Sequence, residues 1–120
     1  MERRKYERIS IELPLDYRSN KFLQFRKARN ISLNGVFLET ENIEPKGTKV
    51  KLSFYFEGAG EALESEGEIV WNRAQTEKKD GVGYPVGMGI RFTKLSILAN
   101  RGIDKKIKIK SNNSGDTLFN

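Results

Sequence analysis

Two small polar side chains and a glycine stand close together in the stretch RNISLNGVF, residues 29–37. Asn30 and Ser32 are two residues apart, so in a strand they point to the same face. Their amide and hydroxyl groups can both donate and accept hydrogen bonds. The pair Asn34-Gly35 follows, and Asn-Gly between apolar runs predicts a hairpin with a type I′ turn, which needs positive φ at both residues. The stretch predicts a turn and leaves open whether that turn carries a binding site.

Arginines gather near the N-terminus in the sequence RRKYER, residues 3–8. Arg4 and Arg8 are separated by three residues, and Arg3 precedes them. A guanidinium group fits phosphate oxygens, or the O6/N7 edge of guanine, through two parallel hydrogen bonds. The segment has too little apolar content to fold alone, so we expect a flexible leader over residues 1–10. It is either a solvated basic segment or a clamp that closes on a highly charged ligand.

Trp71 is a further candidate. It has the same parity as Ile69 in a strand pattern, which favours the interior of a barrel. The alternative is an exposed platform on which a guanine stacks. Near the C-terminus, KKIKIK at residues 105–110 is either a solvated helix end, with cations that complement the helix dipole, or a contact with a partner or a membrane surface.

Composition excludes several kinds of chemistry. The chain of 120 residues has a formal net charge of +6, which favours an anionic partner, and it holds neither cysteine nor histidine. Disulfides, thiolate chemistry, Cys/His zinc sites and mechanisms with a histidine base are therefore excluded. With no nucleophile–base pair, no metal or other cofactor and no catalytic residues are expected, and the protein is not expected to be an enzyme. No apolar run is long enough to span a membrane and no signal peptide is evident, so a cytoplasmic location is expected.

The elements that must position these residues are mainly strands. Alternation of apolar and polar residues predicts strands at residues 9–18, 21–32, 36–40, 49–56, 62–73 and 84–92. Residues 44–48 and the polar, Gly-rich residues 75–83 are predicted to be loops. Ser96 can cap a helix over residues 97–109, with Ala99, Ile103 and Ile107 forming an apolar stripe. Six antiparallel strands in so short a chain predict one small barrel, closed or nearly closed, with the helix over an open end.

The leader RKYER at residues 4–8 and the hairpin motif NISLNG at residues 30–35, in this order around a first strand, resemble the PilZ domain family. The stretches GEIVW, residues 67–71, and VGMGIRF, residues 86–92, resemble the fifth and last strands of that family. The resemblance implies an all-β fold, a six-stranded antiparallel barrel of PilZ type with a C-terminal helix. It implies a barrel domain over residues 10–108, between the leader at 1–10 and a disordered tail at 109–120.

The resemblance also implies a receptor for the bacterial second messenger cyclic di-GMP, a nucleotide ligand. Arg4 and Arg8 would then bind phosphates and guanine edges, Asn30 and Ser32 would hydrogen-bond guanine or phosphate, and Gly35 would let the ligand approach the backbone. The family often has Asp where this chain has Asn30, which removes a charge-assisted hydrogen bond. An arginine at the position of Arg3 goes with two stacked ligand molecules in similar domains.

The sequence leaves three functions to compare. The leading one is a cyclic di-GMP receptor in which ligand binding orders residues 1–10 and so passes the signal to a downstream partner protein, as yet unidentified. An alternative is a ligand-independent protein–protein adaptor of the same fold, which the retained motifs disfavour. A barrel that binds nucleic acid would need exposed aromatic platforms, whereas Phe54, Phe56 and Phe92 lie on strand faces predicted to point inward; no nucleic acid partner is therefore expected.

Overall fold

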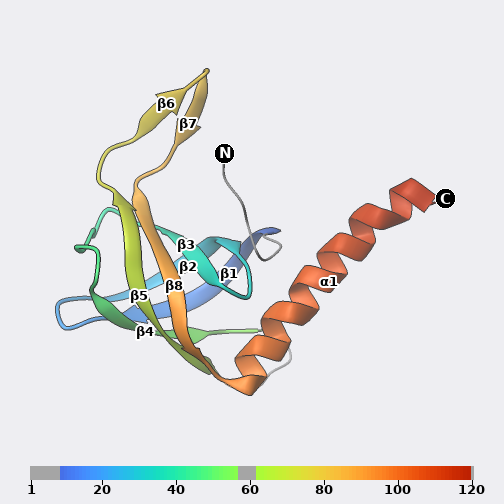
Figure 1. The fold of residues 1–120 in the computed structure, drawn as a ribbon, viewed down its shortest axis with the longest axis horizontal. Helices are drawn as coiled ribbons and strands as arrows, with labels where there is room; N and C mark the ends of the chain where they lie inside the picture. The colour runs from blue at the N-terminus through green and yellow to red at the C-terminus, as the bar shows by residue number, and fades with distance from the viewer. Residues whose placement is uncertain (1–8, 57–61, 120) are drawn as a thin grey trace.

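The computed structural model describes residues 9–56 and 62–119 of the chain. The leader residues Arg3, Arg4 and Arg8 lie outside this range. Within it, strands are followed by a C-terminal helix (Figure 1). The elements are β1 Ile9–Arg18, β2 Leu23–Ile31, β3 Gly35–Glu39, β4 Lys49–Phe54, β5 Leu63–Arg73, β6 Glu77–Lys79, β7 Val82–Tyr84, β8 Gly87–Leu95 and α1 Ile97–Phe119.

The described strands form a closed barrel. Over residues 9–54 and 63–95, six of them pair antiparallel in the order β1-β2-β3-β8-β5-β4, and β6 with β7 forms a separate two-stranded hairpin (Figure 1). A closed barrel leaves none of its own strands with an unpaired edge. The predicted fold class, a six-stranded antiparallel β-barrel with a C-terminal helix, is confirmed.

Alternation within the strands fills the barrel. On β4, Val50, Leu52 and Phe54 are buried, whereas Lys49 and Lys51 are exposed. Burying each such apolar side chain stabilises a fold by roughly 1.5–3 kcal/mol. The same alternation on the other strands, with two residues of the helix, completes the core. Its other members are Leu13, Leu15, Tyr17, Ala28, Ile31, Val36, Leu38, Ile69, Met88, Ile90, Ile103 and Ile107.

The segment between β5 and β8 differs from the prediction. Residues 75–83 were expected to be a loop, and this expectation is wrong, because β6 and β7 pair as a hairpin that projects beyond the barrel (Figure 1). Its two-residue turn is Asp80-Gly81, with φ of 54° and 79°. Positive φ at both central residues is what a type I′ turn requires, and Asp-Gly supplies it at low cost.

The segment after β3 covers one end of the barrel through buried polar contacts. The hydroxyl of Tyr17 donates to the carboxylate of Glu44, and both side chains are buried. Asn72 donates from Nδ2 to the backbone carbonyl of Glu44 at 3.0 Å. Thr40 Oγ1 donates to Gln24 Oε1 at 2.6 Å. These contacts hold residues 40–48 against the barrel, although this segment forms neither a helix nor a strand.

The helix begins where the sequence predicts. Ser96 Oγ accepts the N–H of Ala99 at 3.0 Å, which is an N-cap hydrogen bond. Ala99, Ile103 and Ile107 are buried as expected. At Gly102 a Cβ atom would lie 3.0 Å from the ring of Phe56, so glycine lets the helix approach closely. The helix continues past the predicted end at residue 109 to Phe119 and runs away from the barrel (Figure 1).

Candidate functional site

The register of β1 and β2 brings the beginning of the first strand beside the polar motif. Ser10 pairs with Asn30, and Ile9 pairs with Ile31. The side chain of Asn30 is half-buried. Since Ile9 directly follows the leader in sequence, the chain enters the barrel next to Asn30. The first described residues of β1 therefore lie beside the polar motif, more than twenty residues away in sequence.

Ser32 builds the corner that joins β2 to β3. Its Oγ accepts the N–H of Asn34 at 3.0 Å and that of Gly35 at 3.3 Å, while its own backbone N–H donates to the Gly35 carbonyl at 2.9 Å. The side chain is 5% exposed. Ser32 is thus a structural part of the turn, with its oxygen engaged by two backbone N–H groups. A serine hydroxyl that accepts hydrogen bonds can still donate its own hydrogen.

The predicted type I′ turn at Asn34-Gly35 is wrong. Among the described residues, positive φ occurs at Gly47, Asp80 and Gly81, and neither member of the predicted pair is among them. Gly35 is required for a different reason, because a Cβ atom there would lie 2.3 Å from the carbonyl oxygen of Ile90. Glycine at this position lets β3 pair closely with β8.

A row of side chains crosses the outside of the barrel from this corner. Asn30 pairs with Phe37, Phe37 with Gly89, and Gly89 with Trp71. The register shifts between Ile69 and Trp71, so Ile69 is buried in the core whereas Trp71 is 37% exposed. The bulge overrides the shared parity and places Trp71 outside the barrel. The structure thus puts Trp71 in the same outer row as Asn30.

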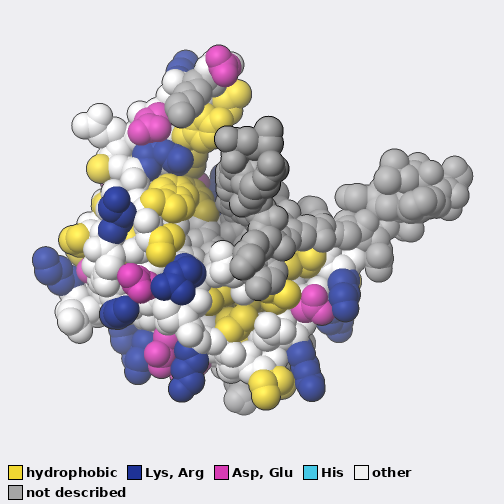
Figure 2. All heavy atoms as spheres, viewed as in Figure 1, with side chains coloured by type: hydrophobic (Ala, Val, Ile, Leu, Met, Phe, Trp, Pro, Cys, Tyr) yellow, Lys and Arg dark blue, Asp and Glu magenta, His cyan; other side chains and the backbone are white. Residues whose placement is uncertain are grey.

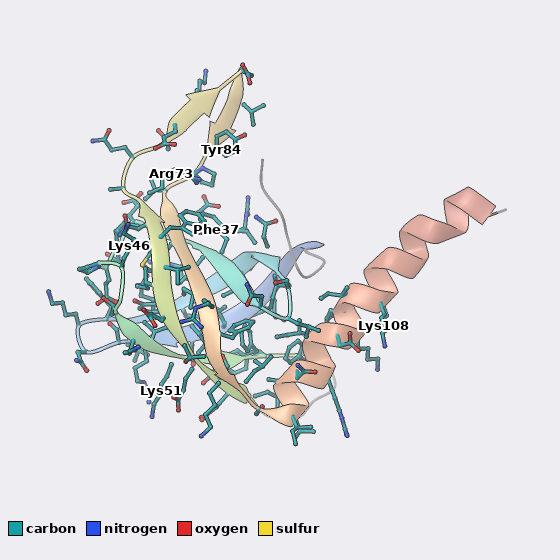
Figure 3. The ribbon with its side chains drawn as sticks, in the orientation of Figure 1. Phe37, Lys46, Lys51, Arg73, Tyr84 and Lys108 are labelled. Atoms are coloured by element: carbon teal, nitrogen blue, oxygen red, sulfur yellow. The ribbon has the colours of Figure 1, made fainter. Side chains whose placement is uncertain are left out.

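Two glycines on β8 make room for aromatic rings on this face. Trp71 lies over Gly89, where a Cβ would meet its Nε1 at 2.1 Å, and the Trp71 and Phe37 rings stack at 5.4 Å with 13° between their planes. The guanidinium carbon of Arg73 lies 5.1 Å from the Trp71 ring centre and 5.4 Å from that of Tyr84 (Figure 3). These contacts tie the β6–β7 hairpin to the aromatic row.

The structure adds one residue that the sequence analysis did not single out. Arg91 pairs with Gly35 on one side and with Glu68 on the other. Its side chain is 47% exposed, and Nη2 lies 3.3 Å from Glu68 Oε1. The signal that could have found it is the alternation of β8, which predicts Gly87, Gly89 and Arg91 on one outward face. The outward position of Arg91 was therefore available in the sequence, whereas its pairing with Gly35 was not.

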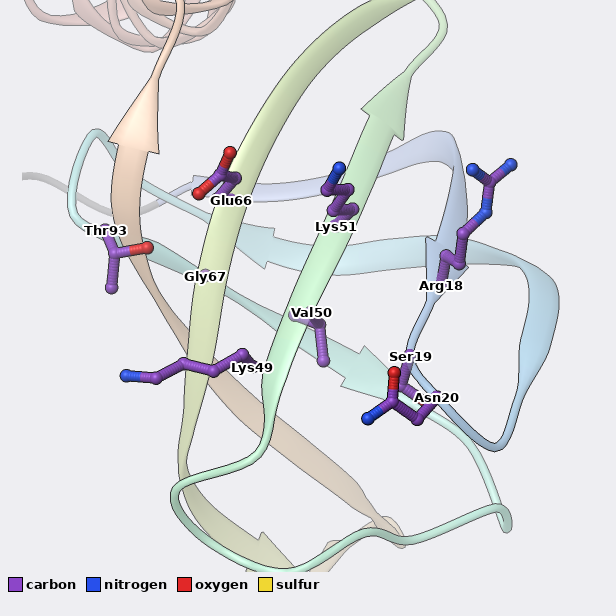
Figure 4. A pocket seen from close by; sticks show the side chains of 9 residues that line it. All are labelled: Arg18, Ser19, Asn20, Lys49, Val50, Lys51, Glu66, Gly67 and Thr93. Atoms are coloured by element: carbon purple, nitrogen blue, oxygen red, sulfur yellow. The ribbon is translucent and has the colours of Figure 1, made fainter.

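Basic and acidic side chains of the described residues are mixed on the face of the barrel that Figure 2 shows. On the face in Figure 2, Lys and Arg side chains are interspersed with Asp and Glu, and hydrophobic side chains lie along the hairpin and the barrel near it. An open cavity of about 400 Å³ lies among the β1–β2 turn, β4, β5 and β8, with Arg18, Lys49 and Lys51 in its wall (Figure 4). Its wall does not include Asn30, Ser32 or Gly35.

The described part of the chain offers neither a metal site nor a membrane-spanning helix. Among residues 9–56 and 62–119, no group of acidic side chains is arranged to hold a metal ion. The described helix is not long and apolar enough to cross a membrane.

Fold and site together define a class: a small closed barrel that presents a polar hairpin corner, a stacked aromatic pair and an arginine on its outer surface. Comparison with protein families identifies the class, since residues 2–108 match the PilZ domain. The chain belongs to the PilZ family, whose members bind cyclic di-GMP and are typically receptors without catalytic activity. A search of curated proteins found no match.

Solved structures share this fold at low sequence identity. An inhibitor of motility from Bacillus subtilis, MotI/DgrA, matches with a TM-score of 0.71 and 14% identity over 93% of this chain. The chain spans about half of that protein, 53% of its length. The PilZ domain of YcgR from Escherichia coli, solved with c-di-GMP, matches at 0.67 and 14% identity over 98% of both chains. PlzA of Borreliella burgdorferi, in complex with c-di-GMP, matches at 0.55 and 18% identity over 85% of this chain and 40% of that one.

Proposed function

We propose that this protein binds cyclic di-GMP at the corner between the leader and the β2–β3 turn, and that it passes this signal to a partner protein. The observation that carries the proposal is the pairing of Ser10 with Asn30. It joins the end of the arginine leader to the polar motif, so one ligand can contact both. A flexible clamp loses entropy on binding, and a ligand with two phosphates and two guanines offers enough contacts to offset that loss.

Each predicted residue has a distinct task in this proposal. Arg4 and Arg8 hold phosphates and guanine edges with their guanidinium groups. Asn30 hydrogen-bonds a guanine, and Ser32 donates its hydroxyl hydrogen to the ligand while its oxygen keeps the turn closed. Gly35 leaves the outer surface beside the turn free of a side chain, which allows a ligand to approach the backbone.

Trp71 contributes a stacking surface at the far end of the outer row. Its partial exposure supports this role, because a fully covered ring could not meet a base. The stack with Phe37 holds the indole in one orientation before the ligand arrives. Arg3 is the residue in the leader that favours two stacked ligand molecules, so the proposal includes a stoichiometry of two.

The relay follows from ordering of the leader. Ligand binding fixes residues 1–10 against the barrel and changes the surface that a partner meets. Hydrogen exchange of peptides from this segment should slow when cyclic di-GMP is added, while core peptides from β4 exchange at an unchanged rate. Unchanged exchange in the leader despite saturation with ligand would contradict the relay but not the binding.

Calorimetric titration of the full chain with cyclic di-GMP tests the binding. We expect a dissociation constant below about 100 µM, roughly −5.5 kcal/mol, and a ratio of two ligands per chain. Arg4→Ala and Arg8→Ala should each abolish or strongly weaken binding. Arg18→Ala is the matched control, since Arg18 is an exposed arginine at the opposite end of β1 and should leave the affinity unchanged.

No heat from the parent protein at that ligand concentration would reject the receptor. The ligand-independent adaptor would then be the function to pursue.

A further inference from the structure

A second row of side chains crosses the outer face next to the aromatic row and ends at the motif glycine. Lys49 of β4 pairs with Glu68 of β5, Glu68 pairs with Arg91 of β8, and Arg91 pairs with Gly35 of β3. Glu68 Oε1 accepts from Lys49 Nζ at 3.1 Å and from Arg91 Nη2 at 3.3 Å. Figure 4 shows Lys49 reaching from β4 across β5. One carboxylate thus holds two cations.

Arg91 is the cation of this row that lies beside the polar corner. Its partner across β3 is Gly35, which has no side chain between Arg91 and the corner, because the β8 backbone at Ile90 lies where a Cβ would stand. The backbone N–H of Gly35 is bound by Ser32 Oγ, which puts the Ser32 hydroxyl at the same corner. A ligand anion held by Ser32 would therefore lie within reach of a long arginine side chain.

The ion pair between Arg91 and Glu68 is weak. It rests on a single contact, and the side chains of Arg91 and Glu68 are 47% and 26% exposed. Exposed ion pairs of this kind contribute at most about a fivefold factor to an equilibrium. A phosphate can instead accept two parallel hydrogen bonds from the guanidinium. Exchange of the carboxylate for a phosphate is thus favourable once the ligand is bound nearby.

We propose that Arg91 is a further phosphate-binding residue of the cyclic di-GMP site, and that Glu68 holds it until the ligand's anion displaces the carboxylate. This inference rests on the function proposed above. By holding Arg91 in the free protein, Glu68 lowers the affinity of the site for its ligand. The β5 and β8 strands are already joined by their backbone ladder, so the ion pair is not needed to hold them together.

Calorimetric titration of surface variants with cyclic di-GMP tests this inference. Arg91→Ala should weaken binding about tenfold or more, the usual effect of removing a hydrogen bond to a charged group. Arg91→Lys should recover only part of the loss, because an ammonium group cannot form the planar double contact. Glu68→Gln should strengthen binding about twofold to fivefold, since it frees Arg91 from the ion pair. A gain in affinity cannot come from a folding defect.

The double variant and a control assign the gain to Arg91. Glu68→Gln should give no increase in the Arg91→Ala background, whereas an increase there would mean that Lys49 or the general potential is responsible and would overturn the holding role. Lys49→Ala, which removes the cation farther from the corner, should change affinity less than twofold. If the parent binds and Arg91→Ala binds equally well, the inference fails while the receptor stands. If the parent does not bind, both fail.

Discussion

Asn30 decides how strongly the corner can hold a guanine. An aspartate there would accept from the guanine N–H groups with full charge, whereas an asparagine offers one neutral carbonyl acceptor and two donors. Charge-assisted hydrogen bonds are roughly twice as strong as neutral ones. We predict that Asn30→Asp strengthens cyclic di-GMP binding about fivefold to tenfold in the same titration. Weaker binding by the variant would show instead that the amide donates to the ligand.

Gly35 carries a stability prediction that does not depend on any ligand. A methyl group at this position would lie 2.3 Å from the Ile90 carbonyl oxygen, a backbone atom that cannot move without opening the β3–β8 ladder. Gly35→Ala should therefore lower the free energy of unfolding by about 1–3 kcal/mol, measured by urea denaturation. Gly83→Ala is the matched control, because no atom lies within 4 Å of its added Cβ. Equal stability of both variants would contradict the close approach.

At the scale of single residues, sequence reasoning recognised the motif but gave part of it the wrong cause. It assigned Gly35 to a turn with positive φ, whereas the structure needs glycine there for packing against β8. For Arg91, the alternation of β8 predicted only that its side chain lies on the outside of the barrel. Its nearness to Gly35 depends on the pairing of two strands more than fifty residues apart, and no local pattern encodes that register.

At the scale of elements, the strands of the barrel were predictable because their alternation is strong, as in KVKLSF. The hairpin was not, since β6 and β7 are three residues each, and the side chains of Glu77, Lys78 and β7 are exposed. The type I′ turn that the sequence analysis predicted at Asn34-Gly35 is found instead at the Asp80-Gly81 pair between β6 and β7. The bulges at Ala28/Asn30 and Ile69/Trp71 were also beyond the sequence, because a bulge is set by how two strands fit together.

The β6–β7 hairpin depends on Arg73 for its attachment. Arg73 lies against the Trp71 and Tyr84 rings, donates from Nη1 to the Pro85 carbonyl at 2.8 Å, and pairs with Glu77. An isolated two-stranded hairpin is marginally stable in water. Arg73→Ala should therefore speed hydrogen exchange of the β7 amides, while the core strands exchange as before.

A charge-preserving variant separates stacking from charge in this hairpin. Arg73→Lys keeps the cation but loses the planar surface that stacks on aromatic rings. We expect it to speed exchange nearly as much as Arg73→Ala. Full protection in the lysine variant would show that the ion pair with Glu77, rather than stacking, holds the hairpin.

At the scale of the whole molecule, the stability of the barrel should depend on alkaline pH through Tyr17. Burial raises the pKa of this phenol above its ordinary value of about 10, and the hydrogen bond to the Glu44 carboxylate raises it further. Above about pH 10, the unfolded chain therefore loses the Tyr17 proton while the folded chain keeps it. The stabilisation is complete below that pH and declines as the pH rises, by up to about 1.4 kcal/mol per unit.

Urea denaturation at a series of pH values from neutral to alkaline measures this decline, and Tyr17→Phe should remove the part that Tyr17 causes. At neutral pH the same variant should be less stable by about 1–3 kcal/mol, because the buried Glu44 carboxylate loses its donor. Tyr55→Phe is the comparison: the hydrogen bond to Asp16 also raises the pKa of this exposed phenol, and its removal should take away a smaller part of the decline than Tyr17→Phe does. If Tyr17→Phe keeps the full alkaline decline, the phenol is not protected by the barrel, and this prediction is wrong.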